Sequence, residues 1–206
     1  MIPRIKICGI TRLEDALAAV EAGADALGFV FYERSKRYID PREVARILDA
    51  IPPFITITGL FVNAGRDAIR ATASVCRLDV IQLHGDEAPG ACRGLPGRVI
   101  KAVRVGGPED LMGLERFPVQ GLLLDAKVAD HYGGSGQMFD WSLISGYRCA
   151  LPMILAGGLN PDNVVSAVRQ VRPYAVDVSS GVEVMPGVKD PEKMAQFVRR
   201  VRQAAA

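Results

Sequence analysis

A thiol and a carboxyl group each close a short apolar segment of this chain. Cys8 ends the segment 4–8, and Asp125 directly follows residues 121–124. A thiol at the C-terminal end of a strand lies where parallel sheets place ligands, and a carboxyl group removed from water favours the neutral form that donates a proton. Proton transfer is therefore the first chemistry that these positions suggest. The alternatives are a buried structural cysteine and, for Asp125, a helix N-cap or an ion-pair partner of Lys127.

Glycine-bearing turns follow two later apolar segments. Gly157 and Gly158 come after the first of these segments, and Ser180 and Gly181 come after the second. Glycine allows backbone N–H groups to approach an anion closely, although turn glycines without a ligand are the alternative. Two such turns in succession favour a phosphate site.

A basic loop and a lone histidine complete the candidate residues. The loop 33–38 carries Arg34 and Arg37, and a planar guanidinium there can hold a carboxylate through two hydrogen bonds, a geometry that lysine does not match. A solvated surface loop is the alternative. His84 shares strand parity with Gln82, so these two side chains can satisfy each other, and no role is assigned to His84. No zinc-ligand spacing is present, and no metal is expected.

The segments that carry these residues alternate with amphipathic helical patterns. The first helix is predicted to begin with a capping box from Thr11 to Glu14, and the weakest helices are predicted at 108–114 and 140–145. A short helical stretch is also expected at 86–92. Apolar strands are predicted at residues 4–8, 25–31, 54–62, 78–83, 98–103, 120–124, 152–156 and 174–178.

Eight strand–helix units predict an α/β fold in which residues 1–206 form one (βα)8 barrel with eight parallel strands. A doubly wound open sheet is the alternative. It usually has a glycine-rich first turn, whereas the turn after Cys8 has a single glycine. In a barrel the carboxyl ends of all strands meet at one mouth. Cys8, Asp125 and both glycine-bearing turns would therefore face a common pocket.

The composition argues against several kinds of partner. Because 25 basic residues nearly balance 23 acidic ones, neither nucleic acid nor an anionic membrane is expected to bind. The longest uncharged run, 50–65, contains two prolines and is too short to cross a bilayer. The four cysteines lack C-x-x-C spacing, and no basic-then-apolar leader precedes the first strand. These features predict a reduced, cytoplasmic protein.

Motifs along nearly the whole chain occur together in one known family. They lie at residues 6–11, 28–31, 35–38, 61–63, 82–85, 124–125, 133–136, 139–141, 156–161 and 176–183. With them the chain resembles phosphoribosylanthranilate isomerase, the (βα)8-barrel enzyme of tryptophan biosynthesis. Gln137 and Met138 depart from the family, which more often has a lysine and a hydroxyl residue there. That departure concerns the behaviour of the sixth loop rather than the reaction.

The resemblance implies a role for each candidate residue. Cys8 would be the general base, Asp125 the general acid and Arg37 the ligand of the anthranilate carboxylate. Lys6, on the same strand face as Cys8, could favour the thiolate. The phosphate site would be formed by the last two loops, with Gly157, Gly158, Ser180 and Gly181.

The implied reaction is the Amadori rearrangement of N-(5-phospho-ribosyl)anthranilate to the carboxyphenylamino-deoxyribulose phosphate, without a cofactor. The expected partner is a small-molecule phosphosugar, and the chain is expected to be a monomer or a homodimer. Two other hypotheses remain. Another phosphosugar enzyme on this barrel, such as indole-glycerol-phosphate synthase or the sugar-phosphate isomerase of histidine biosynthesis, would use a lysine acid or two aspartates. A non-catalytic phosphometabolite-binding protein would bind product tightly without turnover.

Overall fold

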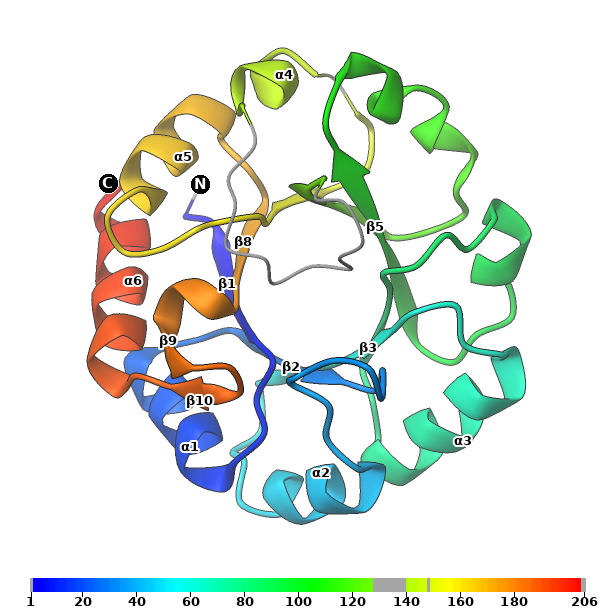
Figure 1. The fold of residues 1–206 in the computed structure, drawn as a ribbon, viewed down its shortest axis with the longest axis vertical. Helices are drawn as coiled ribbons and strands as arrows, with labels where there is room; N and C mark the ends of the chain where they lie inside the picture. Colours follow the sequence, from blue (N-terminus) through cyan, green and yellow to red (C-terminus); the bar gives the residue numbers. More distant parts are fainter. Residues whose placement is uncertain (1, 128–139, 148, 205–206) are drawn as a thin grey trace.

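The structure of the chain, a computed structural model, describes residues 2–127, 140–147 and 149–204. Eight parallel strands close into a barrel in sequence order, with β1 paired to β8 (Figure 1). This arrangement confirms the predicted α/β barrel. The strands are β1 (Arg4–Cys8), β2 (Ala26–Val30), β3 (Thr56–Phe61), β4 (Val80–Leu83), β5 (Arg98–Val105), β6 (Gly121–Ala126), β7 (Met153–Leu155) and β8 (Ala175–Val178).

Helices surround the barrel on its outside (Figure 1). The α-helices are α1 (Leu13–Ala22), α2 (Pro41–Leu48), α3 (Arg66–Cys76), α4 (Ser142–Ser145), α5 (Val164–Val171) and α6 (Pro191–Ala204). After β4 and β5 the described chain forms only the 3-10 turns η1 (Pro89–Cys92), η2 (Pro108–Leu111) and η3 (Leu114–Arg116). The short helical stretch expected at 86–92 is thus a 3-10 helix, and the helix predicted at 108–114 is wrong as an α-helix. Gly113, at φ 72°, separates η2 from η3 and prevents one continuous helix.

Alternation along the strands decides which side chains face the barrel interior. In β1, Ile5 and Ile7 join the main core between the sheet and the helices. Cys8 instead packs in a separate apolar cluster with Val30, Leu60 and Val62. Successive side chains point to opposite faces of a strand. The side chains with reactive groups therefore face the barrel interior, while the aliphatic side chains pack against the helices.

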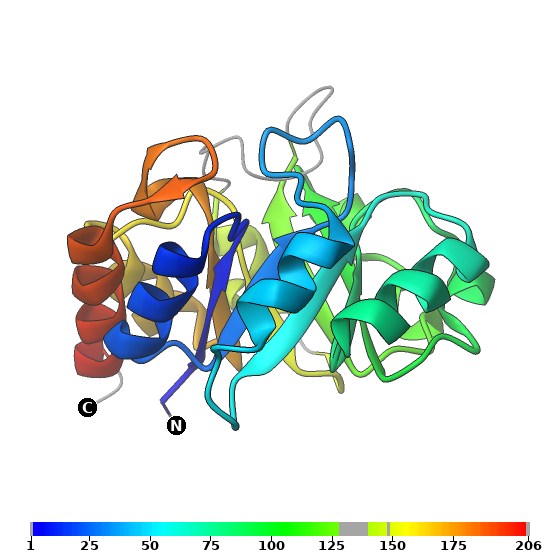
Figure 2. The ribbon, with the colours of Figure 1, turned by 90° about the horizontal axis from the view of Figure 1, so that it is seen from below.

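A hairpin that the sequence did not predict follows β8. It consists of η4 (Ser180–Val182), β9 (Glu183–Met185) and β10 (Val188–Lys189). Figure 2 shows the hairpin on the same side of the barrel as the loop after β2, and both chain termini on the opposite side. The hydroxyl of Thr11 donates to the carbonyl of Gly187 in this hairpin, and α1 has no side-chain cap. The predicted capping box is therefore wrong, because a tertiary contact takes the hydroxyl.

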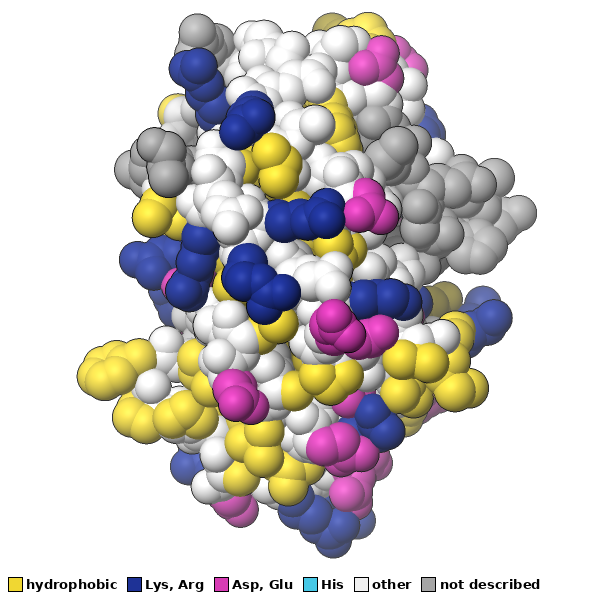
Figure 3. Space-filling model, turned by 90° about the vertical axis from the view of Figure 1, so that its left-hand side faces the viewer, with side chains coloured by type: hydrophobic (Ala, Val, Ile, Leu, Met, Phe, Trp, Pro, Cys, Tyr) yellow, Lys and Arg dark blue, Asp and Glu magenta, His cyan; other side chains and the backbone are white. Residues whose placement is uncertain are grey.

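The last helix closes the ring against the start of the chain. α6 buries Met194, Phe197, Val198 and Val201 against the core. Figure 3 shows the side formed by α5, α6 and α1, where basic side chains lie among acidic and apolar ones. Within the described residues, no helix has the length and apolar character needed to cross a membrane.

Candidate active site

A pocket opens at the carboxyl ends of the strands. Cys8 enters it from β1 and Asp125 from β6, with β7 and β8 between them in the closed sheet. Arg37 and the loops after β7 and β8 form its rim. The predicted residues that line the pocket are Cys8, Arg37, Asp125, Gly157, Gly158 and Ser180. His84, Asp177 and Ser179 line it as well. The structure therefore brings these groups together at one mouth.

The Cys8 thiol is buried beside a cation and an anion. Burial raises the pKa of Cys8, the ammonium of Lys6 lowers it, and the carboxylate of Asp177 raises it. The net direction is upward, so the expected effect of Lys6 is present but is outweighed by loss of water around the thiol. Cys8 is therefore a weaker acid than an ordinary thiol.

Lys6 keeps its charge inside the barrel. Burial alone would lower the pKa of Lys6, but Asp177 and Cys8 outweigh burial and raise the pKa. The Lys6 ammonium donates to Asp177 Oδ2 at 3.0 Å and to Gln82 Oε1 at 2.8 Å. A buried ammonium paired in this way is a fixed positive charge next to the thiol.

Gln82 and His84 extend this polar chain across the barrel to Asp125. Gln82 Nε2 lies 2.9 Å from His84 Nδ1, and His84 Nε2 lies 3.2 Å from Asp125 Oδ2. Because an ammonium can only donate, the oxygen of Gln82 faces Lys6 and its NH2 group faces His84. Nδ1 of His84 is then an acceptor, and the proton of a neutral imidazole lies on Nε2, pointed at Asp125. The shared parity of Gln82 and His84 thus has a consequence for the candidate acid.

Among the described residues Asp125 takes neither of its two alternative roles. The ammonium of Lys127 pairs with Asp110 instead, at 2.8 Å. The N-cap position of α4 is Trp141, so Asp125 caps no described helix. Asp125 is buried in β6, where its Oδ1 accepts from the N–H of Ala126 at 2.8 Å and its Oδ2 faces His84.

Arg37 is not the solvated side chain that the alternative interpretation required. Its Nε and Nη2 donate to the two oxygens of Glu183, at 2.8 and 2.7 Å. Burial alone would lower the pKa of Arg37, but the hydrogen bond and charge of Glu183 raise it. For Glu183, burial would raise the pKa, but hydrogen bonds and charges from Arg37 and Lys189 lower it. Both groups are therefore ionised, and the guanidinium is held at the pocket rim.

The loops after β7 and β8 present backbone to the pocket. Gly157 and Gly158 have φ of 83° and 64°, a region that favours glycine. Gly181 does not line the pocket, because its Cα packs directly against the carbonyl of Leu159 and leaves no room for a Cβ. Gly181 thus brings the two loops together, while Gly157, Gly158 and Ser180 face the cavity.

The sequence assigned no role to Asp177, Glu183 or Lys189, whereas it predicted that Lys6 favours the thiolate. Lys6 and Asp177 interrupt otherwise apolar strands on the inward parity, which was the available signal for a buried ion pair. Glu183 and Lys189 gave no such signal, because they lie in an unpredicted hairpin. No group of three or more His, Cys, Asp or Glu side chains in the described part of the chain could hold a metal ion. The motif 133–136 and the departure at Gln137 and Met138 lie outside the described residues.

The comparisons with known proteins agree with this geometry. A sequence model of the family described as N-(5'-phosphoribosyl)anthranilate (PRA) isomerase matches residues 5–200. The chain belongs to this family. The PRA isomerase of Magnetococcus marinus is 56% identical over 204 residues, which cover 99% of this chain and 97% of that protein.

Solved PRA isomerases superimpose on the whole barrel. The structure from Thermotoga maritima has a TM-score of 0.89 and 48% identity, covering 98% of this chain and 99% of that one. The Thermotoga maritima enzyme is dimeric. A PRA isomerase in complex with reduced 1-(o-carboxyphenylamino)-1-deoxyribulose 5-phosphate has a TM-score of 0.89 and 46% identity, over 98% and 99% of the two chains. The resemblance seen in the sequence motifs is confirmed, and the chain is an isomerase of tryptophan biosynthesis.

Proposed function

We propose that this chain converts N-(5-phospho-β-D-ribosyl)anthranilate to 1-(2-carboxyphenylamino)-1-deoxy-D-ribulose 5-phosphate, with Asp125 as general acid and Cys8 as general base. The observation that carries the proposal is that a buried thiol from β1 and a buried carboxyl group from β6 line one pocket. Residues 1–206 are proposed to act as one catalytic domain. No cofactor is required, because proton transfers alone complete the rearrangement.

The acid step opens the ribose ring. Asp125 donates its proton to the ring oxygen, the C1′–O bond breaks, and the anthranilate nitrogen supplies the electron pair that forms the C1′ iminium. The Nε2–H of His84 points at Asp125 Oδ2, 3.2 Å away, and stabilises the carboxylate left by this transfer. His84 is thereby a positioning partner of the acid rather than its replacement.

The base step removes the proton from C2′. The thiolate of Cys8 takes this proton, and the C2′–H electron pair forms the enolamine while the iminium nitrogen is neutralised. The enolamine then becomes the ketone by moving a proton from the C2′ hydroxyl to C1′. The charge of Lys6 favours the thiolate before this step, and that of Asp177 opposes it. Because the thiolate depends on this charge, the Lys6 ammonium has to stay in place when the dianionic phosphate and the carboxylate of the substrate bind.

The two ends of the substrate find separate anion sites at the rim. The backbone around Gly157, Gly158, Ser180 and Gly181 is proposed to bind the phosphate, since these loops follow the two strands where barrels often bind phosphate. Arg37 is proposed to hold the anthranilate carboxylate. The complex of a family member with a reduced carboxyphenylamino-deoxyribulose phosphate supports a small phosphosugar ligand.

The test is turnover of phosphoribosylanthranilate, followed by loss of the substrate's fluorescence. Asp125→Asn keeps the side-chain shape but removes the transferable proton, so turnover should be abolished while product affinity is retained. Substantial turnover by this variant would show that another group protonates the sugar, with His84 the first to examine. Conversion of the indole-glycerol-phosphate or histidine-pathway substrates instead would replace the proposed reaction.

The cellular location and the oligomeric state of the protein are also proposed. All four cysteines are free thiols, which supports a reduced cytoplasmic location. The chain is proposed to be a monomer or a homodimer, and one family member is dimeric. Cell fractionation measures the location, and sedimentation equilibrium measures the oligomeric state.

A further inference from the structure

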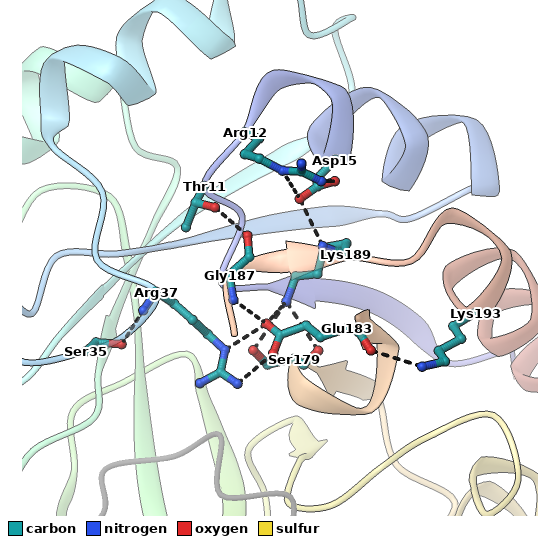
Figure 4. A network of polar contacts seen from close by, with 10 residues as sticks. All are labelled: Thr11, Arg12, Asp15, Ser35, Arg37, Ser179, Glu183, Gly187, Lys189 and Lys193. Atoms are coloured by element: carbon teal, nitrogen blue, oxygen red, sulfur yellow. Dashed lines mark hydrogen bonds and ion pairs between the residues drawn. The ribbon is translucent and has the colours of Figure 1, made fainter. Parts of the chain in front are cut away.

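A cluster of three charged side chains, two of them buried, lies at the base of the hairpin (Figure 4). Glu183 accepts from Nε and Nη2 of Arg37, at 2.8 and 2.7 Å, and from Nζ of Lys189 at 2.7 Å. The side chains of Glu183 and Lys189 are 5% and 0% exposed. We call Arg37, Glu183 and Lys189 the hairpin cluster. Its ion pairs are shielded from water, so their geometry is much more restricted than that of surface pairs.

The hairpin cluster leaves one edge of the Arg37 guanidinium available. A guanidinium offers donors along its Nε–Nη2 edge and along its Nη1–Nη2 edge. Glu183 occupies the first edge, and among the described residues no hydrogen bond involves Nη1. Arg37 also lines the pocket. The edge that remains is therefore the one able to form a two-bond contact with a ligand carboxylate.

The aliphatic part and the backbone of Arg37 also have close contacts. Its Cδ packs over Gly9, where a Cβ would approach it to 2.5 Å, and Gly9 has φ of 74°. The backbone N–H of Arg37 donates to Ser35 Oγ at 3.1 Å. Glycine at position 9, directly after Cys8, thus makes room for the arginine beside the thiol.

Lys189 links the hairpin cluster to the rest of the mouth. Its ammonium donates to the carbonyl of Ser179, at 3.2 Å, next to the proposed phosphate loop. Its backbone N–H donates to Asp15 Oδ2 in α1 at 3.0 Å. Arg12 holds the same carboxylate (Figure 4). Glu183 is therefore fixed by a partner that is itself anchored to two other elements.

We infer that Glu183 is a positioning residue that presents the free edge of Arg37 to the carboxylate of the substrate, and so makes the site selective for an aglycone with a carboxyl group. The inference rests on the proposed function, since it takes Arg37 as the carboxylate ligand. Lys189 acts through Glu183 and does not contact that carboxylate.

Loss of the Glu183 charge tests orientation rather than net charge. Burial lowers the pKa of Lys189, and Glu183 is the main group that opposes this shift. Loss of the carboxylate therefore lowers the pKa of Lys189 further, which limits the rise in positive charge of the cluster. Glu183→Gln then leaves a charged but poorly oriented Arg37.

The experiment measures binding of two stable ligands by calorimetry. One is reduced 1-(o-carboxyphenylamino)-1-deoxyribulose 5-phosphate, and the other is its phenylamino counterpart without the carboxyl group. Glu183→Gln should weaken the carboxylated ligand about tenfold, as expected for one charge-assisted hydrogen bond, and change the other by less than about twofold. KM for the natural substrate should rise.

Lys193→Gln is the matched control. Lys193 donates to the backbone carbonyl of Glu183 at 3.0 Å, so it contacts the same residue without touching its carboxylate. It should leave the ratio of the two affinities unchanged. Glu183→Asp, which keeps the charge but shortens the reach, should give a smaller loss confined to the carboxylated ligand and serves if Glu183→Gln fails to fold.

The outcomes separate this inference from the function on which it rests. Equal weakening of both ligands by the Glu183 variants, or no weakening, would overturn the positioning role. Arg37→Lys is measured alongside them. If that variant also leaves the affinity ratio unchanged, Arg37 is not the carboxylate ligand and the proposed function fails at that residue. A changed ratio in Arg37→Lys with an unchanged ratio in the Glu183 variants overturns the inference alone.

Discussion

Replacement of Gly28 by alanine should displace the Cys8 thiol, the proposed base, without removing any reactive group. Gly28 in β2 is the strand partner of Cys8 in β1. A Cβ at position 28 would lie 2.7 Å from Cys8 Sγ and 2.9 Å from Lys6 Cε. Alanine therefore meets the proposed base and its neighbouring cation at the same time.

The size of the effect follows from these distances. Non-bonded heavy atoms ordinarily approach to about 3.5–4.0 Å, so Sγ has to move by roughly 1 Å to accept a Cβ at 2.7 Å. A misplacement of about 1 Å in a catalytic geometry can cost ~10²-fold in rate. Overpacking a closely packed interior costs about 1–3 kcal/mol of stability. We expect kcat of Gly28→Ala to fall about a hundredfold and its free energy of unfolding to fall by about 1–3 kcal/mol.

Gly59→Ala is the control, because it overpacks the barrel away from the thiol. A Cβ there would press against Leu78 Cδ1 and lie 3.0 Å from Phe31 Cε2. Steady-state kinetics and urea unfolding of both variants give kcat and stability separately. Both should lose stability, but only Gly28→Ala should lose most of its kcat. Near-normal kcat in Gly28→Ala, or an equal loss in Gly59→Ala, would refute the argument that the position of the Cys8 thiol limits the rate.

Three further substitutions test the other groups of the site. Cys8→Ala should lower kcat by the ~10²–10⁴ expected for one positioned base while KM changes little, and near-full kcat would exclude Cys8 as the base. Lys6→Met removes a charge that lowers the pKa of Cys8, so the pKa should rise further, the thiolate fraction at a given pH should fall, and alkylation of Cys8 followed across pH should require more alkaline conditions. An unchanged pH profile would mean that Lys6 does not act on the thiol. Arg37→Lys should raise KM more than it lowers kcat, because an ammonium cannot bridge Glu183 and a substrate carboxylate in the same way, and an unchanged KM would contradict the carboxylate role.

Local regularities predicted the barrel and much of its mouth. The alternation of apolar strands with amphipathic helices led to eight units, and β1 to β8 are found in that order. Strand parity placed Cys8 on the polar face of β1, where it faces the interior. These inferences succeed because a strand repeats every two residues and a helix about every 3.6, so a side chain's direction is set by its immediate neighbours. The helix prediction at 108–114 failed because proline and glycine produce 3-10 turns there instead.

What the sequence alone determined is thus the strand and helix order and the positions of the candidate acid and base. Tertiary structure alone decided their surroundings. Arg37 and Glu183 are 146 residues apart, and Lys6 and Asp177 are 171 apart, so no local period relates them. Closure of β1 onto β8 brings each pair together. The same closure buries Cys8, and because burial outweighs the charge of Lys6, the pKa of the thiol rises although its sequence neighbour favours a fall.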